Sequence, residues 1–131
     1  MAIGQWRYVR FNGRATRLTY WLWGVGQWVA LFAIVILVSR IFGQNLDKNG
    51  FAKFEDISLL GQIVGVAAVF LVGWIGVCVE VQRWHDRGKS GWWYWLFFIP
   101  LIGAMWTFGE CGFLRGTPGP NRFGPDPLAE K

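Results

Sequence analysis

Three long stretches of the chain contain no Asp, Glu, Lys or Arg, and they limit what this sequence can fold into. They are residues 18–39, 57–79 and 90–109, with 22, 23 and 20 residues. A helix needs about 20 apolar residues to cross the roughly 30 Å hydrocarbon core of a bilayer. Lipid offers no hydrogen-bond partner to an exposed peptide group, so each stretch must be helical. We therefore expect an all-α integral membrane protein with three transmembrane helices.

The third stretch contains an interruption, because Pro100 removes a helical hydrogen bond and Gly103 follows it. One alternative is that this stretch enters the membrane and turns back. Two arms of about 11 residues would each reach only about 16 Å, which is half of the hydrocarbon thickness. Length therefore favours one third helix kinked at Pro100, with a neighbouring helix compensating for the lost hydrogen bond.

The remaining segments are short, which predicts a single membrane domain over residues 1–131. Only 16% of the residues are charged, against about 25% in an ordinary soluble domain. The first 17 residues lack the apolar core of a signal peptide, so we expect the first span to be an uncleaved anchor. The segments outside the spans are a basic cytoplasmic segment (1–17), a loop (40–56), a charged corner (80–89) and an irregular Pro/Gly-rich tail (110–131).

The positions of Lys and Arg give an expected orientation. Four precede the first span, and three each lie in the first loop, the second loop and the tail, so three spans place seven on one side and six on the other. The first helix usually dominates, and its four preceding arginines have no acid among them. We expect the amino terminus inside and the tail on the outer side.

Residues for catalysis or metal binding are few. His85 is the only histidine, so the pair His85-Asp86 has too few companions for a metal-dependent hydrolase. Cys78 and Cys111 have no metal-ligand spacing, and three spans would place them about 30 Å apart near opposite faces, as small apolar packing residues. Most of the 10 tryptophans lie in or beside spans, where an aromatic belt explains them better than nucleic-acid binding does. We expect no enzyme activity, no metal, no cofactor and no nucleic acid.

Three polar and aromatic motifs, in this order, resemble the small bacterial inner-membrane proteins grouped as domain of unknown function 805. They are F-x-G-R-x-x-R-x-x-Y-W at 11–21, R-x-H-D-x-x-x-S-G-W-W at 83–93 and G-T-P-G-P-N-R-F-G-P-D-P at 116–127. Members often have a second arginine where this chain has Gln82. The candidate residues are a polar cluster of Arg14, Arg17, Tyr20, Arg83, His85, Asp86 and Ser90, the interfacial aromatic residues Trp21, Trp92 and Trp93, and the tail residues Gly116, Asn121, Arg122, Gly124, Asp126 and Pro127.

The resemblance implies a multi-pass inner-membrane protein and implies no activity. It places the first two motifs on one side of the membrane, so we expect Asp86 to pair with Arg14 or Arg17. The cluster is interpreted either as a structural ionic lock or as a site for anionic lipid, another membrane protein or a second copy. We expect a non-catalytic scaffold or regulator that uses this cluster. The alternatives are a small oligomeric channel or transporter and, third, an enzyme acting on lipid or envelope substrates.

Overall fold

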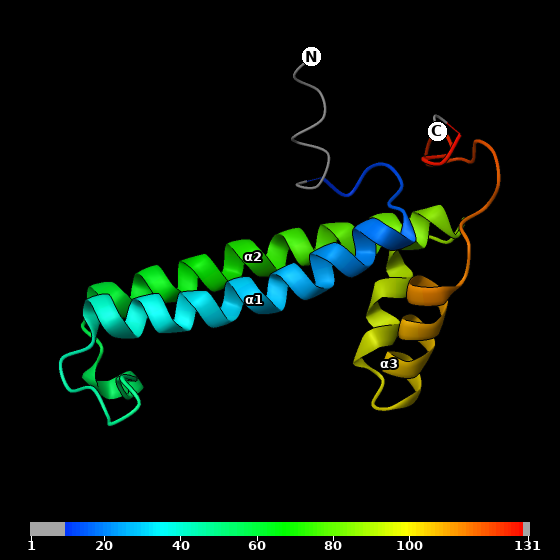
Figure 1. Cartoon of the computed structure of the whole chain (residues 1–131). Helices are drawn as coiled ribbons and strands as arrows, with labels where there is room; N and C mark the ends of the chain where they lie inside the picture. Colours follow the sequence, from blue (N-terminus) through cyan, green and yellow to red (C-terminus); the bar gives the residue numbers. More distant parts are fainter. Residues whose placement is uncertain (1–9, 130–131) are drawn as a thin grey trace, which may run out of the picture. The chain divides into compact units, whose positions relative to one another are not determined.

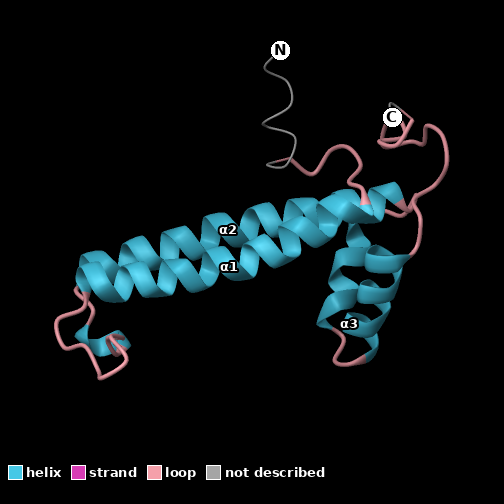
Figure 2. Cartoon of the chain, viewed as in Figure 1, coloured by secondary structure: helices cyan, strands magenta, loops and turns pink. Residues whose placement is uncertain are grey.

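The computed structural model describes residues 10–129 and divides into two compact units. The terminal unit contains the chain up to Gly24 and from Ile75 onward, and the central unit is Val25–Trp74. Within the described part the regular elements are all helical, with only isolated β-bridges in loops (Figure 2). Arg7, part of the expected basic segment, lies outside the described residues.

Two helices are long and apolar enough to cross a membrane, α1 (Arg17–Phe42) and α2 (Leu59–Asp86). Helix α1 contains the first predicted stretch, and α2 contains the second except for residues 57–58. Helix α2 continues for seven residues beyond Val79, so most of the expected corner belongs to its last two turns. It ends before Gly88, whose φ of 72° is the left-handed conformation that glycine adopts most easily after a helix.

In the central unit, the carboxyl-terminal part of α1 and the amino-terminal part of α2 lie side by side (Figure 1). Glycines allow this approach, because a Cβ on Gly61 would lie 2.7 Å from Cγ of Phe42. A short helix, η2 (Phe54–Asp56), lies in the loop between them, and the Asp47 carboxylate accepts the backbone N–H of Phe51 at 2.9 Å. The loop is therefore ordered by local hydrogen bonds.

The third stretch is a helical hairpin, and this corrects the expectation of one span kinked at Pro100. Its first arm is the 3₁₀-helix η3 (Gly91–Phe98), and its second arm is α3 (Ile102–Thr107) continued by η4 (Phe108–Phe113). The chain reverses at Leu101, which has φ 60° and ψ −62°, and α3 packs against η3 (Figure 1). A Cβ on Gly103 would lie 2.8 Å from the carbonyl carbon of Leu96, so glycine is needed where the arms meet.

The hairpin returns the tail to the end of α2, which overturns two further expectations. The backbone N–H of Thr117 donates to the carbonyl of Asp86 at 2.8 Å, so the tail does not lie on the opposite side from the charged corner. Cys111 lies beside Glu80, which is only two residues from Cys78, so the cysteines are not near opposite faces. Both cysteines are free and buried, as expected of small packing residues.

Candidate functional site

One buried carboxylate in the last turn of α2 is the centre of the terminal unit. Asp86 accepts a hydrogen bond from Nε of Arg14 at 2.9 Å and another from Nη1 of Arg83. Asp86, Arg14 and Arg83 are 4%, 1% and 0% exposed. The expected partner of Asp86 on the amino-terminal segment is therefore Arg14. Two guanidinium groups share one carboxylate, so this group of three carries one excess positive charge.

Backbone carbonyl oxygens accept further hydrogen bonds from these guanidinium groups. Arg14 donates to Gly119 at 2.7 Å and to Thr117, and Arg83 donates to Cys111 at 2.7 Å and to Leu114. Hydrogen bonds from a charged donor are about twice as strong as neutral ones. The tail backbone thus stabilises the excess charge, and the charge in turn fixes the tail.

Two neighbouring positions fit this arrangement closely. Gly116 lies directly against Asp86, since a Cβ there would be 2.6 Å from Oδ1 of the carboxylate. Gln82 donates from Nε2 to the carbonyl of Arg10 at 2.6 Å. The backbone carbonyl of Gln82 accepts the N–H of Ala15 at 3.1 Å. An amide therefore ties the amino-terminal segment to α2 without adding a third buried cation.

His85 holds the tail by stacking. Its ring lies parallel to that of Phe123, with centroids 3.8 Å apart and an interplanar angle of 5°. Its backbone carbonyl accepts a hydrogen bond from the Asn121 amide at 3.0 Å. The guanidinium of Arg122 lies 4.6 Å from the centroid of the Phe123 ring. The histidine thus contacts the third motif.

The rest of the tail motif forms its own turn. Asn121 and Gly124 exchange two backbone hydrogen bonds of 3.0 Å. The Asp126 carboxylate accepts the backbone N–H groups of Leu128 at 2.9 Å and Gly119 at 3.0 Å, and these hydrogen bonds lower its pKa. Pro127 follows within a turn. The proline-rich sequence is therefore a shaped loop.

A second ionic group was not predicted. Glu110 accepts hydrogen bonds from Nε of Arg87 at 2.9 Å and from Nζ of Lys89 at 2.7 Å. Burial alone would raise the pKa of Glu110, but these hydrogen bonds and the two positive charges lower it below its ordinary value. Lys89 also lies 4.6 Å from the ring centroid of Trp93. Three spans would put Glu110 on the opposite side from Arg87, so this ion pair does not follow from the sequence.

The remaining candidate residues have separate positions. Arg17 donates to the carbonyl of Phe113 at 2.9 Å, so it is not the partner of Asp86. Trp21 donates from Nε1 to the carbonyl of Gly112 at 3.0 Å, and Ser90 caps η3. The rings of Trp92 and Trp93 are exposed, and Tyr20 lines a pocket together with Glu80 and Thr107.

The geometry assigns a holding role to the polar cluster. Arg14, Arg83 and Asp86 lie away from solvent and direct their polar atoms at one another and at backbone carbonyls. Among residues 10–129, no three His, Cys, Asp or Glu side chains come together as a metal site would require. The cluster joins the amino-terminal segment, α2 and the tail into one cap, which we define as residues 10–16, 82–90 and 110–129.

A model of the family described as "Protein of unknown function (DUF805)" matches residues 8–125, which include all of the cap except residues 126–129. The chain belongs to this family. It is 38% identical to the inner membrane protein YhaH of Escherichia coli K12, over 94% of this chain and 91% of that one. It is 33% identical to the inner membrane protein YhaI of the same strain, over 92% of this chain and 87% of that one. No solved structure matches.

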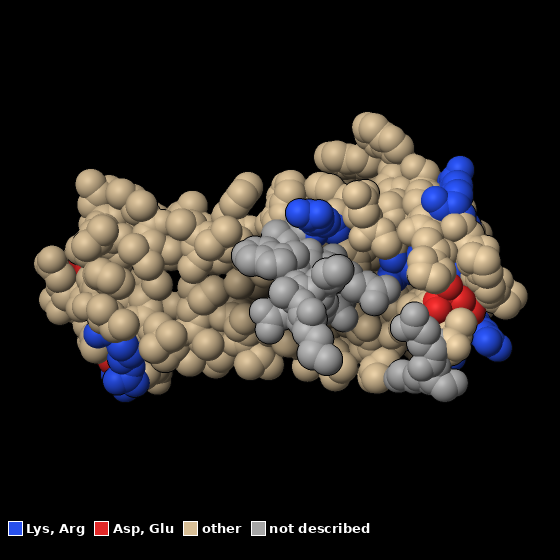
Figure 3. Space-filling view, turned by 90° about the horizontal axis from the view of Figure 1, so that it is seen from above, with Lys and Arg blue, Asp and Glu red and all other residues tan. Residues whose placement is uncertain are grey.

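The inner-membrane location of these relatives agrees with the exposed apolar side chains of α1 and α2. Leu18, Trp28 and Phe70 are 61%, 75% and 70% exposed, which is costly in water and favourable in lipid. In the space-filling view, wide areas carry no charged side chain (Figure 3). The chain is a multi-pass protein of the bacterial inner membrane, in a family without an assigned activity.

Proposed function

We propose that this chain is a non-catalytic inner-membrane scaffold or regulator whose cap, together with the adjoining Arg17, binds the headgroups of anionic lipids. The observation that carries the proposal is the division of the arginines by burial. Arg14 and Arg83 are buried and hold the fold, whereas four arginines of this end of the terminal unit are exposed to solvent. These four are Arg10, Arg17, Arg115 and Arg122.

The exposed arginines have few acids to neutralise them. Of the four acids in the described part of the terminal unit, Asp86 is buried in the cluster and Glu110 is paired with two cations. The central unit differs, because its three Lys and Arg residues are balanced by three Asp and Glu residues. A basic side chain beside an anionic leaflet contributes on the order of 1 kcal/mol, so several together give useful affinity.

The hairpin keeps the expected cytoplasmic amino terminus and moves the tail to the same side, which supports this proposal. With two spans, residues 1–17 and 83–131 share one side and carry ten Lys and Arg, whereas the loop between α1 and α2 has three including Arg40. The positive-inside rule then favours a cytoplasmic cap strongly. The cytoplasmic leaflet surface has a negative potential, which attracts such a cap.

Lipid-dependent stability of the purified full-length protein tests the proposal. The protein is placed in nanodiscs of phosphatidylcholine with or without phosphatidylglycerol, and the melting temperature is measured at low and high salt. We expect phosphatidylglycerol to raise the melting temperature, and salt to reduce the gain by screening. The variant Arg10→Gln/Arg115→Gln removes two of the four exposed arginines, so it should lose about half of the gain. These two are chosen because both side chains are exposed and neither forms a hydrogen bond within the cap.

The matched control is Lys48→Gln/Lys53→Gln, which removes two exposed cations from the loop between α1 and α2. This variant should keep most of the wild-type gain. If both double variants respond to phosphatidylglycerol as the wild type does, the exposed arginines of the cap are not the lipid site.

A further inference from the structure

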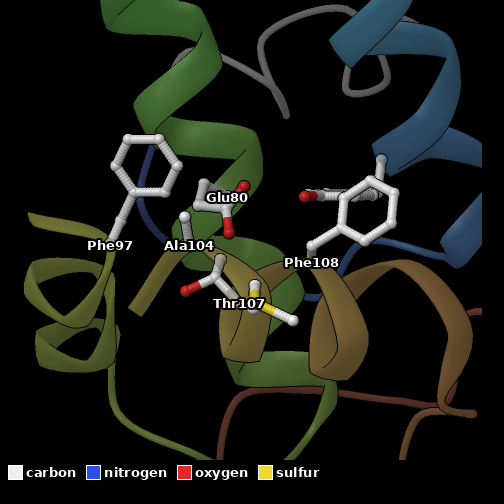
Figure 4. A pocket seen from close by; sticks show the side chains of 7 residues that line it. Glu80, Phe97, Ala104, Thr107 and Phe108 are labelled. Carbon is white, nitrogen blue, oxygen red and sulfur yellow. The ribbon is translucent and has the colours of Figure 1, made fainter. Parts of the chain in front are cut away.

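A pocket of about 340 Å³ lies in the terminal unit (Figure 4). None of the ion-paired residues Arg14, Arg83 and Asp86 lines it. Three polar side chains face it, namely Glu80 from α2, Tyr20 from α1 and Thr107 from α3. The close-up shows the side chain of Glu80 between the rings of Phe97 and Phe108. The hairpin thus encloses an acid from α2 with aromatic rings from both of its arms.

Two polar atoms in this pocket have no hydrogen-bond partner in the described part of the chain. They are Oε1 of Glu80 and Oγ1 of Thr107, and Thr107 is only 2% exposed. The thiol of Cys111 lies beside Glu80, but a thiol is only a weak donor. Arg83 lies nearby and directs its donors to Asp86 and to backbone carbonyls. Buried polar atoms are normally satisfied, so these two point to a donor supplied from outside.

We propose that this pocket binds an organic ammonium group attached to an apolar molecule. A primary ammonium has three N–H donors, and the pocket has three side chains with acceptor oxygens, Glu80, Tyr20 and Thr107. The faces of aromatic rings attract cations, and Phe97 and Phe108 line the pocket. A carboxylate among aromatic rings suits a cation that is only weakly hydrated.

The rim of the pocket indicates the route of entry. Phe97, Met105 and Phe108 line the pocket and are 52%, 74% and 48% exposed. Apolar side chains exposed this far in a membrane protein face lipid, so the ligand enters from the lipid side. The ammonium can belong to a lipid with an ethanolamine headgroup or to a small amphiphilic amine. This site is separate from the exposed arginines, so the two proposals stand or fall independently.

Binding to the full-length protein in detergent tests the proposal with three probes. Phosphatidylethanolamine and hexylammonium carry N–H donors, whereas phosphatidylcholine carries a quaternary ammonium without them. We expect at least one of the first two to raise the melting temperature, and phosphatidylcholine to raise it much less. A response to phosphatidylethanolamine identifies a lipid as the source, and a response to hexylammonium alone identifies a small amine.

Variants locate the site. Glu80→Gln keeps the shape of the side chain and removes its charge, so the affinity for the active probe should fall by roughly tenfold or more. Glu55→Gln, in the loop between α1 and α2, should leave the affinity unchanged. If Glu80→Gln does not fold, Thr107→Val and Tyr20→Phe each remove one hydroxyl and should weaken binding severalfold. The proposal is overturned if no ammonium probe binds the wild type, if phosphatidylcholine binds equally well, or if the pocket variants bind as the wild type does.

Discussion

Replacing Asp86 by Asn tests whether ion pairing holds the cap together. The side chain keeps its shape, but the group of three residues goes from one excess positive charge to two. Its partners Arg14 and Arg83 are 1% and 0% exposed, so water cannot replace the lost carboxylate. Removing one partner from a buried ion pair costs about 3–5 kcal/mol. Because backbone carbonyls still accept from both arginines, we expect the lower end, about 3 kcal/mol.

The assay is the apparent free energy of unfolding of the full-length protein in detergent, measured by denaturant titration with helical content as the signal. Trypsin cleavage after Arg115 and Arg122 gives a second reading, since the tail should become accessible. The control Asp56→Asn, in the loop between α1 and α2, should change the free energy by less than about 0.5 kcal/mol. A loss below about 1 kcal/mol for Asp86→Asn, with an unchanged tail cleavage rate, would refute the reasoning.

Three further changes probe other contacts. Gly116→Ala places a methyl group against the Asp86 carboxylate, so we expect a loss of about 1–3 kcal/mol in the same titration. Gly61→Ala places one against Phe42 and should cost a similar amount, because α1 and α2 must separate there. Acidification should destabilise the cap through Glu110, because folding lowers the pKa of this side chain below its ordinary value of 4.5. The contribution of Glu110 to the free energy of unfolding is therefore present above pH 4.5 and is lost as the pH falls through the pKa of the folded state.

Each of these changes has an internal comparison. A Cβ on Gly24 would have no atom within 4 Å, so Gly24→Ala should leave the free energy of unfolding unchanged or raise it slightly. If Gly24→Ala lowers the free energy of unfolding as much as Gly61→Ala does, the contact with Phe42 is not the cause of that loss. Glu110→Gln should flatten the acid dependence around and below pH 4.5. If its pH profile overlays that of the wild type, another group controls the acid response. If Gly116→Ala unfolds as the wild type does, the tail moves freely away from α2.

The uncharged stretches predicted the first two spans, and the placement of two motifs on one side of the membrane predicted one ion pair. Uncharged stretches of 22 and 23 residues indicate helices because lipid leaves the backbone no other solution. The pairing of Asp86 with Arg14 follows once both are placed at the same membrane surface. The sequence did not show that α2 continues through the charged corner, because residues with formal charge were taken to end the span.

The hairpin was missed because each arm was required to be long enough to cross the hydrocarbon core. Two short arms cannot cross the hydrocarbon core, but a hairpin whose ends return to one side does not need to cross it. The relevant local signals were Pro100, which interrupts the helix, and Gly103, where the backbone of Leu96 leaves no room for a side chain. Glu80 was missed as a site residue for the same reason, since Thr107 and Phe108 reach it from the returning arm. Glu110 was missed because the returning arm itself brings it to Arg87 and Lys89.

The near tie in the orientation count was itself a signal against three spans. Three spans put seven and six Lys and Arg on the two sides, whereas a returning third stretch puts ten and three, a bias typical of inner-membrane proteins. Two reporters can be fused after Lys131, one that is active only in the cytoplasm and one that is active only in the periplasm. We therefore expect only the first to be active. When the same two reporters are inserted after Lys48, between α1 and α2, only the one that is active in the periplasm should be active. A periplasmic tail with a periplasmic loop would restore the third span, and a periplasmic tail with a cytoplasmic loop would keep the hairpin and invert the protein. Only the cytoplasmic tail brings the exposed arginines to the leaflet surface whose negative potential attracts them.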